Sequence, residues 1–325
     1  MEMDAQTLIR RHDVLKNLHQ QVNDCESFFL SPSDLQGFGI RAYQVGITDD
    51  GVLQFHPCFF LPHPERVLQK YPIDTSQISV DDCPKLNNRP DFDSILRDVL
   101  ISNPNAEDPF TLAMEEYEEL MLVAGPHEWE SRAHETQYYM SWHISTYRKG
   151  RPIFSSLVGL GSLTALWRTK RKTTGPRTYE RGFGLHWRIE SLLEDSDESS
   201  PIPHAIMETI AHVPANHADQ SLTLHEVRAI VNMMLIRTSQ KPFRKYPIHP
   251  LLVLSYMGEQ HGRIIQASFD GENLVLQYSQ LWSFEDDDTA PVELFMRYNI
   301  SRTVGLERSD ACVRALAESV ASMNL

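Results

Sequence analysis

The most distinct pattern of apolar and polar positions in this chain runs from residue 246 to residue 300. Residues 251–257 form an almost unbroken apolar run, which is typical of a strand buried on both faces. Turns that contain glycine separate this run from two further strand-like segments, 264–269 and 274–278. Behind Pro291, apolar side chains recur at helical spacing. The pattern predicts three consecutive strands followed by a helix.

Other segments repeat one of these two patterns. Apolar side chains recur every three to four residues in four segments, which predicts helices near 5–24, 109–123, 223–238 and 309–322. Asp4 can cap the first of these helices, and Thr223 with Glu226 has the sequence of a capping box. Alternating patterns at 38–60, where a hairpin is expected, and at 136–160 predict more antiparallel sheet. The expected fold class is α+β: antiparallel sheet pieces with covering helices, ending in a helix–strand–strand–strand–helix unit.

Two polar stretches interrupt these patterns and bear on domain organisation. Residues 62–90 are rich in proline and indicate a long connection, and the acidic, serine-rich run 194–200 indicates an exposed linker. A single core rarely grows beyond about 250 to 300 residues, and this chain has 325. We therefore expect an N-terminal α+β region at 1–195 and a C-terminal region at 201–325, or one domain in which the two intertwine.

Composition narrows the class of protein. The chain is 41% hydrophobic and holds five tryptophans, which is ample for a globular fold. Its net charge of −14 argues against broad binding to nucleic acid or to anionic membranes, because both require a positive surface. Its first residues lack the apolar stretch of a signal peptide, and no window approaches the roughly 20 apolar residues of a membrane span. The expected location is the cytoplasm or nucleus, with no membrane partner.

The residue types that often bind metal ions form no convincing site. The four cysteines form no C-x-x-C pair, which argues against a zinc site or a disulfide framework; they are Cys25, Cys58, Cys83 and Cys312. His204, Glu208 and His212 lie four residues apart, on one face of an expected helix. They would span about 12 Å, which is too far for one ion. We expect them to be surface residues, and no resident metal or cofactor is predicted.

One stretch reverses the acidic character of the chain. Residues 168–181 carry clustered basic side chains, with Trp167 and Tyr179 interleaved; the basic residues are Arg168, Lys170, Arg171, Lys172, Arg177 and Arg181. Basic side chains beside aromatic rings are typical of contacts to nucleic acid, so the first four are the candidate nucleic-acid-binding residues. The alternative is a basic loop that pairs with the protein's own acidic surface.

A second candidate binding site lies at the turn between the first two C-terminal strands. His261 and Arg263 flank Gly262 there, where polar side chains can converge on a ligand. The alternative is that this histidine is a turn residue bonded to backbone or solvent.

The element order from 223 to 300 suggests an enzymatic hypothesis. A helix, three strands and a helix resemble the core of the PD-(D/E)XK nuclease-like superfamily. In that family a helix glutamate, a strand-end aspartate and a strand Glu-x-Lys surround a divalent metal ion. The resemblance implies Glu226 as the helix carboxylate and Asp270 as the aspartate, with Glu272 as a further metal ligand. The basic stretch 168–181 would then hold the nucleic acid.

The third strand departs from that family pattern. No lysine follows Lys245 in this chain. The lysine of such sites stabilises charge near the attacked phosphate, so Gln277 or Arg263 would have to stand in for it. A divalent metal ion is implied only under this hypothesis.

A second resemblance rests on the segments HPLLVLSYMGEQHGRIIQASFDG and LWSFEDDDTAPVELFMRY, which are similar to a stretch of intracellular proteins of filamentous fungi. It implies a fungal origin and no particular activity. The chain has neither a phosphate-binding glycine loop nor a G-x-S-x-G nucleophile elbow. The first hypothesis is therefore a soluble, non-enzymatic binding or scaffold protein with a protein partner. The alternative is a metal-dependent, nuclease-like enzyme or its inactive relative.

Overall fold

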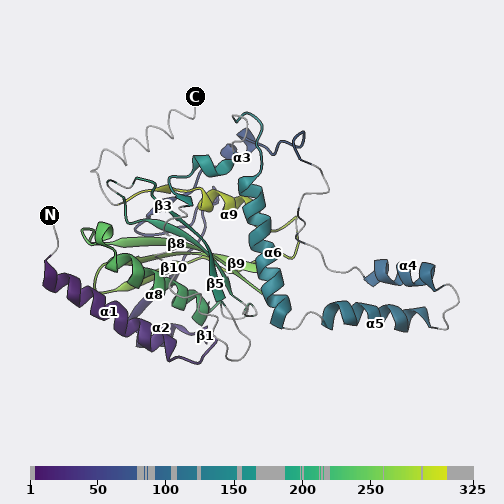
Figure 1. Ribbon diagram of the computed structural model, residues 1–325, viewed down its shortest axis with the longest axis horizontal. Helices are drawn as coiled ribbons and strands as arrows, with labels where there is room; N and C mark the ends of the chain where they lie inside the picture. Colours follow the sequence, from purple (N-terminus) through teal and green to yellow (C-terminus); the bar gives the residue numbers. More distant parts are fainter. Residues whose placement is uncertain are drawn as a thin grey trace.

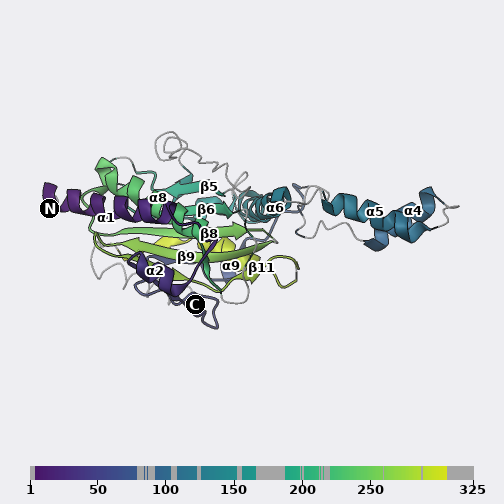
Figure 2. The same ribbon diagram turned by 90° about the horizontal axis from the view of Figure 1, so that it is seen from below.

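A computed structural model of the chain has a twisted mixed sheet with helices on both faces (Figure 1 and Figure 2). The structure describes residues 4–78, 84, 86, 92–103, 108–122, 126–151, 156–165, 187–197, 199, 201–211, 213, 215, 220–258, 260–286 and 288–305. The helices and strands together confirm the α+β fold class.

Eight strands of the described residues form the central sheet. They are β2 (Ile40–Gln44), β4 (Thr164–Ala165), β5 (Trp187–Glu194), β6 (Ala205–Ala211), β8 (His249–Met257), β9 (His261–Phe269), β10 (Leu274–Tyr278) and β11 (Trp282–Ser283). Their order is β2, β10, β9, β8, β6, β5, β4, and β11 pairs with β9. The pairs β6–β8 and β2–β10 are parallel, and the other pairs are antiparallel.

Two short strand pairs and several helices surround this sheet. The short pairs are β1 (Phe29–Leu30) with β7 (Leu222–Thr223) and β3 (Phe60–Leu61) with β12 (Arg302–Thr303). The α-helices are α1 (Ala5–Asn23), α2 (Pro32–Gly37), α3 (Arg66–Lys70), α4 (Phe92–Ser102), α5 (Pro109–Leu122), α6 (Pro126–Ser145), α8 (Leu224–Ser239) and α9 (Val292–Asn299). Single 3₁₀ turns occur at Leu157–Leu160 and Lys241–Phe243.

α1 and α8 cover one face of the sheet and pack against each other (Figure 1). Leu15 and Ile230 belong to the apolar core that these helices share with Val253 of β8. Arg228 of α8 donates from Nη2 to the carbonyl oxygens of Asn23 and Cys25, at 2.9 and 3.0 Å. Because the last carbonyls of a helix lack partners within it, this arginine caps the end of α1.

α6, α9 and residues 53–60 cover the opposite face. Met140 of α6, Phe295 of α9 and Phe59 pack with Tyr256 of β8 in a second apolar core. The side chains of β8 point alternately into the two cores, and all nine of its residues are buried. The central strand thus has a covering layer on each side, as its apolar run predicts.

α4 and α5 form a helical hairpin that extends away from the sheet (Figure 1 and Figure 2). Ile95, Val99 and Ala113 form a small apolar cluster between the two helices. The end of α4 and the start of α5 lie at the far end of the hairpin, so this free end points away from the body (Figure 1).

Several sequence predictions are confirmed. β8, β9, β10 and α9 follow one another as the pattern from 246 to 300 indicates. Asp4 accepts a hydrogen bond from the backbone N–H of Thr7, and Thr223 forms the predicted capping box with Glu226. The helices expected near 5–24, 109–123 and 223–238 correspond to α1, α5 and α8. The helix expected at 309–322 lies outside the described residues.

The strand predicted from residue 136 is wrong, because residues 136–145 belong to α6. Tyrosine, threonine and isoleucine give this segment a high strand propensity. The buried residues of α6 nevertheless recur at helical spacing: Ala133, Thr136, Gln137, Met140 and Ile144. Packing of that face against the sheet decides the conformation.

The hairpin predicted at 38–60 forms only in part. The turn is present, since the backbone N–H of Gly51 donates to the carbonyl of Thr48 at 2.9 Å. Beyond it, Ile47 and Leu53 make a single isolated bridge, and β2 pairs with β10 instead. The apolar residues after the turn are used to cover the sheet rather than to extend it.

The helix predicted for His204, Glu208 and His212 is wrong, whereas the exposed linker predicted at 194–200 is confirmed in part, since Ser196, Asp197 and Ser199 are exposed and Glu194 is not. His204 precedes β6 and Glu208 lies within it, and every residue of β6 is buried. Glu194 is the last residue of β5 and forms a buried ion pair with Arg237 of α8. The apolar residues around Glu208 favour a strand covered on both faces over a surface helix. His212 lies outside the described residues.

The sheet takes strands from both sides of the expected boundary near 195. β2, β4 and β5 precede it, and β6, β8, β9 and β10 follow it. β5 and β6 are direct neighbours, so the boundary falls between two paired strands.

Gly262→Ala should destabilise the fold through crowding at the start of β9. A Cβ there would lie 2.9 Å from the carbonyl oxygen of Ser255 and 3.1 Å from the Phe284 ring. Overpacking of this kind costs roughly 1–3 kcal/mol in the free energy of unfolding, which urea denaturation would measure. Gly37→Ala is the control, because a Cβ at this helical position meets no atom within 4 Å. Equal effects of the two substitutions would contradict this account.

Candidate functional site

The carboxylates of the nuclease-like hypothesis lie at opposite ends of β9. Glu226 is paired with Arg263 near the start of that strand, whereas Asp270 directly follows its end. Arg263 and Asp270 are seven residue steps apart along extended chain, which corresponds to about 23 Å. The structure therefore does not bring Glu226 and Asp270 to one metal ion. Nor does the described part of the chain contain any group of three His, Cys, Asp or Glu side chains placed to bind one.

Glu226 is engaged by its own chain. One carboxylate oxygen, Oε2, accepts a hydrogen bond from the backbone N–H of Thr223 at 2.8 Å. The other, Oε1, lies 3.2 Å from Nε of Arg263, and both side chains are fully buried. An uncompensated buried charge is costly, so this pair holds the N-terminus of α8 at the start of β9.

Asp270 shapes the turn between β9 and β10. Its Oδ1 accepts the backbone N–H groups of Glu272 and Asn273 at 2.9 and 2.8 Å. Partial burial raises the pKa of Asp270, but these hydrogen bonds outweigh it and the pKa lies below its usual value. Glu272 points to the surface and pairs with Arg10 at 2.8 Å.

Gln277, the stand-in for the nuclease lysine, holds a covering segment on the sheet. Its Oε1 accepts the backbone N–H of His56 at 2.6 Å. Gln266 on β9 binds the same segment, accepting from the backbone N–H of Phe59 and donating to the carbonyl of Pro57, both at 2.8 Å. Sequence reasoning missed Gln266, although an amide in a strand buried on both faces signals a specific partner.

His261 and Arg263, the candidate ligand-binding residues, both lie within β9 and are buried. Arg263 donates from Nη1 and Nη2 to the carbonyls of Gln220 and Ser221, each at 2.9 Å. With Nε facing Glu226, its donors serve the protein itself. The candidate nucleic-acid-binding residues, Arg168, Lys170, Arg171 and Lys172, lie outside the described residues.

Glu208, which sequence reasoning placed on the surface, is a buried carboxyl group. It accepts hydrogen bonds from Ser191 Oγ at 2.6 Å and from the amides of Gln137 and Asn299 at 3.0 Å each. Burial raises the pKa of Glu208 despite these donors. Four elements, β5, β6, α6 and α9, meet at this side chain.

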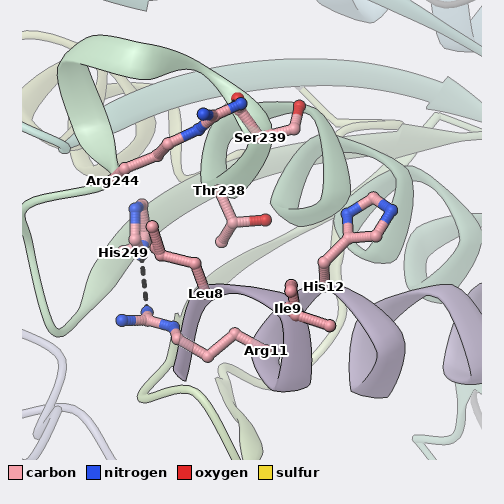
Figure 3. A pocket seen from close by; sticks show the side chains of 8 residues that line it. All are labelled: Leu8, Ile9, Arg11, His12, Thr238, Ser239, Arg244 and His249. Atoms are coloured by element: carbon pink, nitrogen blue, oxygen red, sulfur yellow. Dashed lines mark hydrogen bonds between the residues drawn. The ribbon is translucent and has the colours of Figure 1, made fainter. Parts of the chain in front are cut away.

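A pocket of about 320 Å³ opens between α1 and the C-terminal end of α8 (Figure 3). Leu8, Ile9 and His12 line it from α1, and Thr238 and Ser239 line it from α8. In the same view, Arg244 extends along the α8 side of the pocket. The pocket thus combines an apolar wall on one helix with polar groups on the other.

Arg11 and His249 form the base of this pocket. Arg11 donates from Nη1 and Nη2 to the carbonyls of Tyr246 and Pro247, at 3.1 and 2.9 Å. Its Nη2 also lies 3.2 Å from Nδ1 of His249 (Figure 3), while Nε2 of His249 lies 3.1 Å from the carbonyl of Phe243. These contacts fit a neutral imidazole that donates from Nε2 and accepts at Nδ1.

Burial has a large effect on this histidine. Together with the Arg11 and Arg237 cations, it lowers the pKa of His249 to about 3. Burial likewise lowers the pKa of His143 and of His204 to about 4. All three imidazoles therefore stay neutral in the folded protein at mildly acidic pH.

The free energy of unfolding of Glu208→Gln should rise relative to that of the wild type as pH rises. The folded state holds the Glu208 proton to a higher pH than the unfolded state does, since its pKa is raised from 4.5. The resulting stability is present below pH 4.5 and is lost as pH rises through the folded pKa. The difference between variant and wild type should change by up to about 1.4 kcal/mol per pH unit, measured by urea denaturation from pH 4.5 to 8. Parallel curves would refute the shift.

His249→Gln should weaken the acid sensitivity of the fold. The unfolded chain protonates this histidine near pH 6.5, whereas the folded chain resists protonation until about pH 3. The stability that it contributes is therefore present above pH 6.5 and is lost as pH falls toward 3. Between pH 6.5 and 4.5 the decline in unfolding free energy should be smaller in the variant by up to about 1.4 kcal/mol per pH unit. An unchanged slope in denaturation experiments would show that His249 is not the responsible group.

Comparisons with known proteins found no relative of this chain. No protein-family model, no curated protein and no solved structure matches it. None of the helices in the described ranges is long and apolar enough to cross a membrane.

Proposed function

We propose that this protein is a non-enzymatic binding or scaffold protein of the cytoplasm or nucleus. Its partner, in this proposal, is a basic, amphipathic segment of another protein. The binding surface is the free end of the α4–α5 hairpin. The observation that carries the proposal is the cluster of exposed apolar side chains at that end.

Large apolar side chains gather where α4 ends and α5 begins. Ile101 is 72% exposed, Phe110 is 54% exposed and Leu100 is 48% exposed. Phe110 and Met114 are one helical turn apart on α5, so they share a face. Ile95, Val99 and Ala113 already form the hairpin's own apolar cluster, and the exposed set is additional to it. An apolar group of this kind is typical of a protein-binding site.

Charge selects the chemistry of the partner. Residues 91–122 include nine acidic residues and one basic residue, Arg97. A partner with lysine or arginine around an apolar stripe would complement both features. A second copy of the hairpin would bring like charges together, which disfavours self-association through this surface.

The nuclease-like alternative lacks a supporting observation in the described residues, because Glu226 and Asp270 lie at opposite ends of β9. Within the same residues, Cys25 and Cys58 are free thiols. Free thiols are typical of a reducing compartment, which supports the proposed location.

A designed peptide tests the proposal directly. A fluorescent 20-residue peptide with leucines on one helical face and lysines elsewhere should bind, and the affinity should fall between 50 and 300 mM NaCl. The double substitution Ile101→Ser with Phe110→Ser should weaken binding about tenfold or more, because two anchor side chains are lost. Both residues are exposed, so the thermal midpoint should change little.

Three controls make the result decisive. Tyr43→Ser removes a side chain of similar exposure, 54%, from β2 and should leave binding intact. A peptide with serine in place of leucine should bind much more weakly. Wild-type affinity in the double variant, or equal binding of the two peptides, would overturn the proposal. So would a dimer, seen by sedimentation, that the double variant abolishes, since a second copy would then occupy the surface.

A further inference from the structure

The pocket in Figure 3 is lined by basic side chains, although the protein as a whole is acidic. The chain has a net charge of −14, yet the described residues that line this pocket include no acidic side chain. Arg11, Arg244, His12 and His249 contribute two guanidinium groups and two imidazoles. A volume of about 320 Å³ falls at the lower end of the range for small-molecule sites.

Arg244 uses only one of its side-chain nitrogens as a hydrogen-bond donor to the described residues. Its Nε donates to the carbonyl of Ser239 at 2.9 Å, which caps the end of α8. Its two terminal nitrogens make no hydrogen bond or ion pair with any described residue, and the side chain is exposed. A guanidinium presents paired donors that match a carboxylate or a phosphate.

The end of α8 does not repel an anion as strongly as its exposed carbonyls would suggest. The hydroxyl of Thr238 donates to the carbonyl of Met234 at 2.8 Å, and that of Ser239 donates to Ile236 at 2.7 Å. Together with Arg244, these groups satisfy part of the negative helix end.

Leu8 and Ile9 add an apolar surface opposite Arg244 (Figure 3). Ile9 is 60% exposed, so its side chain is accessible to a ligand. Arg11 is buried beneath and held by the carbonyls of Tyr246 and Pro247, which fixes its positive charge in place.

We infer that this pocket binds a small organic anion with an apolar arm, a carboxylate or a phosphate monoester. The anionic head pairs with Arg244 beside His12, and the arm lies on Leu8 and Ile9. The site is independent of the hairpin surface proposed above, because none of the lining residues belongs to α4 or α5.

Calorimetric titration with hexanoate and with hexyl phosphate tests this inference and distinguishes the two head groups. At least one of them should bind, and Arg244→Gln should weaken that binding at least tenfold. Arg244→Lys should retain part of the affinity, since it keeps the charge and loses the paired donors. Lys241→Gln, which removes a nearby charge that does not line the pocket, should bind as wild type does.

Four results would overturn the inference. They are no binding of either anion at millimolar concentration, equal binding of hexanol, equal binding of inorganic phosphate and hexyl phosphate, or unchanged affinity in Arg244→Gln. Circular dichroism of each variant confirms that the fold is retained, so a loss of affinity reports on the pocket.

Discussion

The central strands of this protein are covered on both faces, and the charged and amide side chains within them are therefore costly to bury unless a covering layer supplies a partner. All nine residues of β8 are buried, and eight of the nine in β9 are buried. A buried polar group without a partner costs about 1–3 kcal/mol, and a buried charge costs more. The polar residues of the sheet thus determine where the surrounding helices and loops attach.

Each attachment joins a sheet residue to one or two covering elements. Arg263 of β9 holds the start of α8 through Glu226, and Glu194 of β5 holds the end of the same helix through Arg237. Glu208 binds α6 and α9 through Gln137 and Asn299. The side chains that most resemble catalytic groups are consequently used in structure. Removing one partner of a buried ion pair destabilises the fold far more than removing one partner of an exposed ion pair, because the remaining charge stays buried and uncompensated.

Local sequence signals predict the parts of the fold that depend on local physics. The apolar run at 251–257, the capping box at Thr223 and the N-cap at Asp4 all lie where these signals indicate. The segment from 136 to 145 could not be assigned in this way, because its strand-forming residues become helical only when one face packs on the sheet. Glu208 is a similar case, since the four elements that bury it come from distant parts of the chain. The separation of Glu226 from Asp270 likewise follows from the length of β9, which element order alone does not convey.

Because many polar groups of the interior are committed to structure, the two binding sites proposed above use groups that stay exposed at the edges of the fold. The exposed apolar end of the α4–α5 hairpin and the Arg244 side of the α1–α8 pocket are two such places, and they lie toward opposite ends of the molecule (Figure 1). The two places differ in charge: the hairpin is acidic and apolar, and the pocket is basic and apolar. A partner segment attracted to the first has the wrong charge for the second. If both proposals hold, this separation would allow one chain to bind a protein and a small anion at the same time without competition between them.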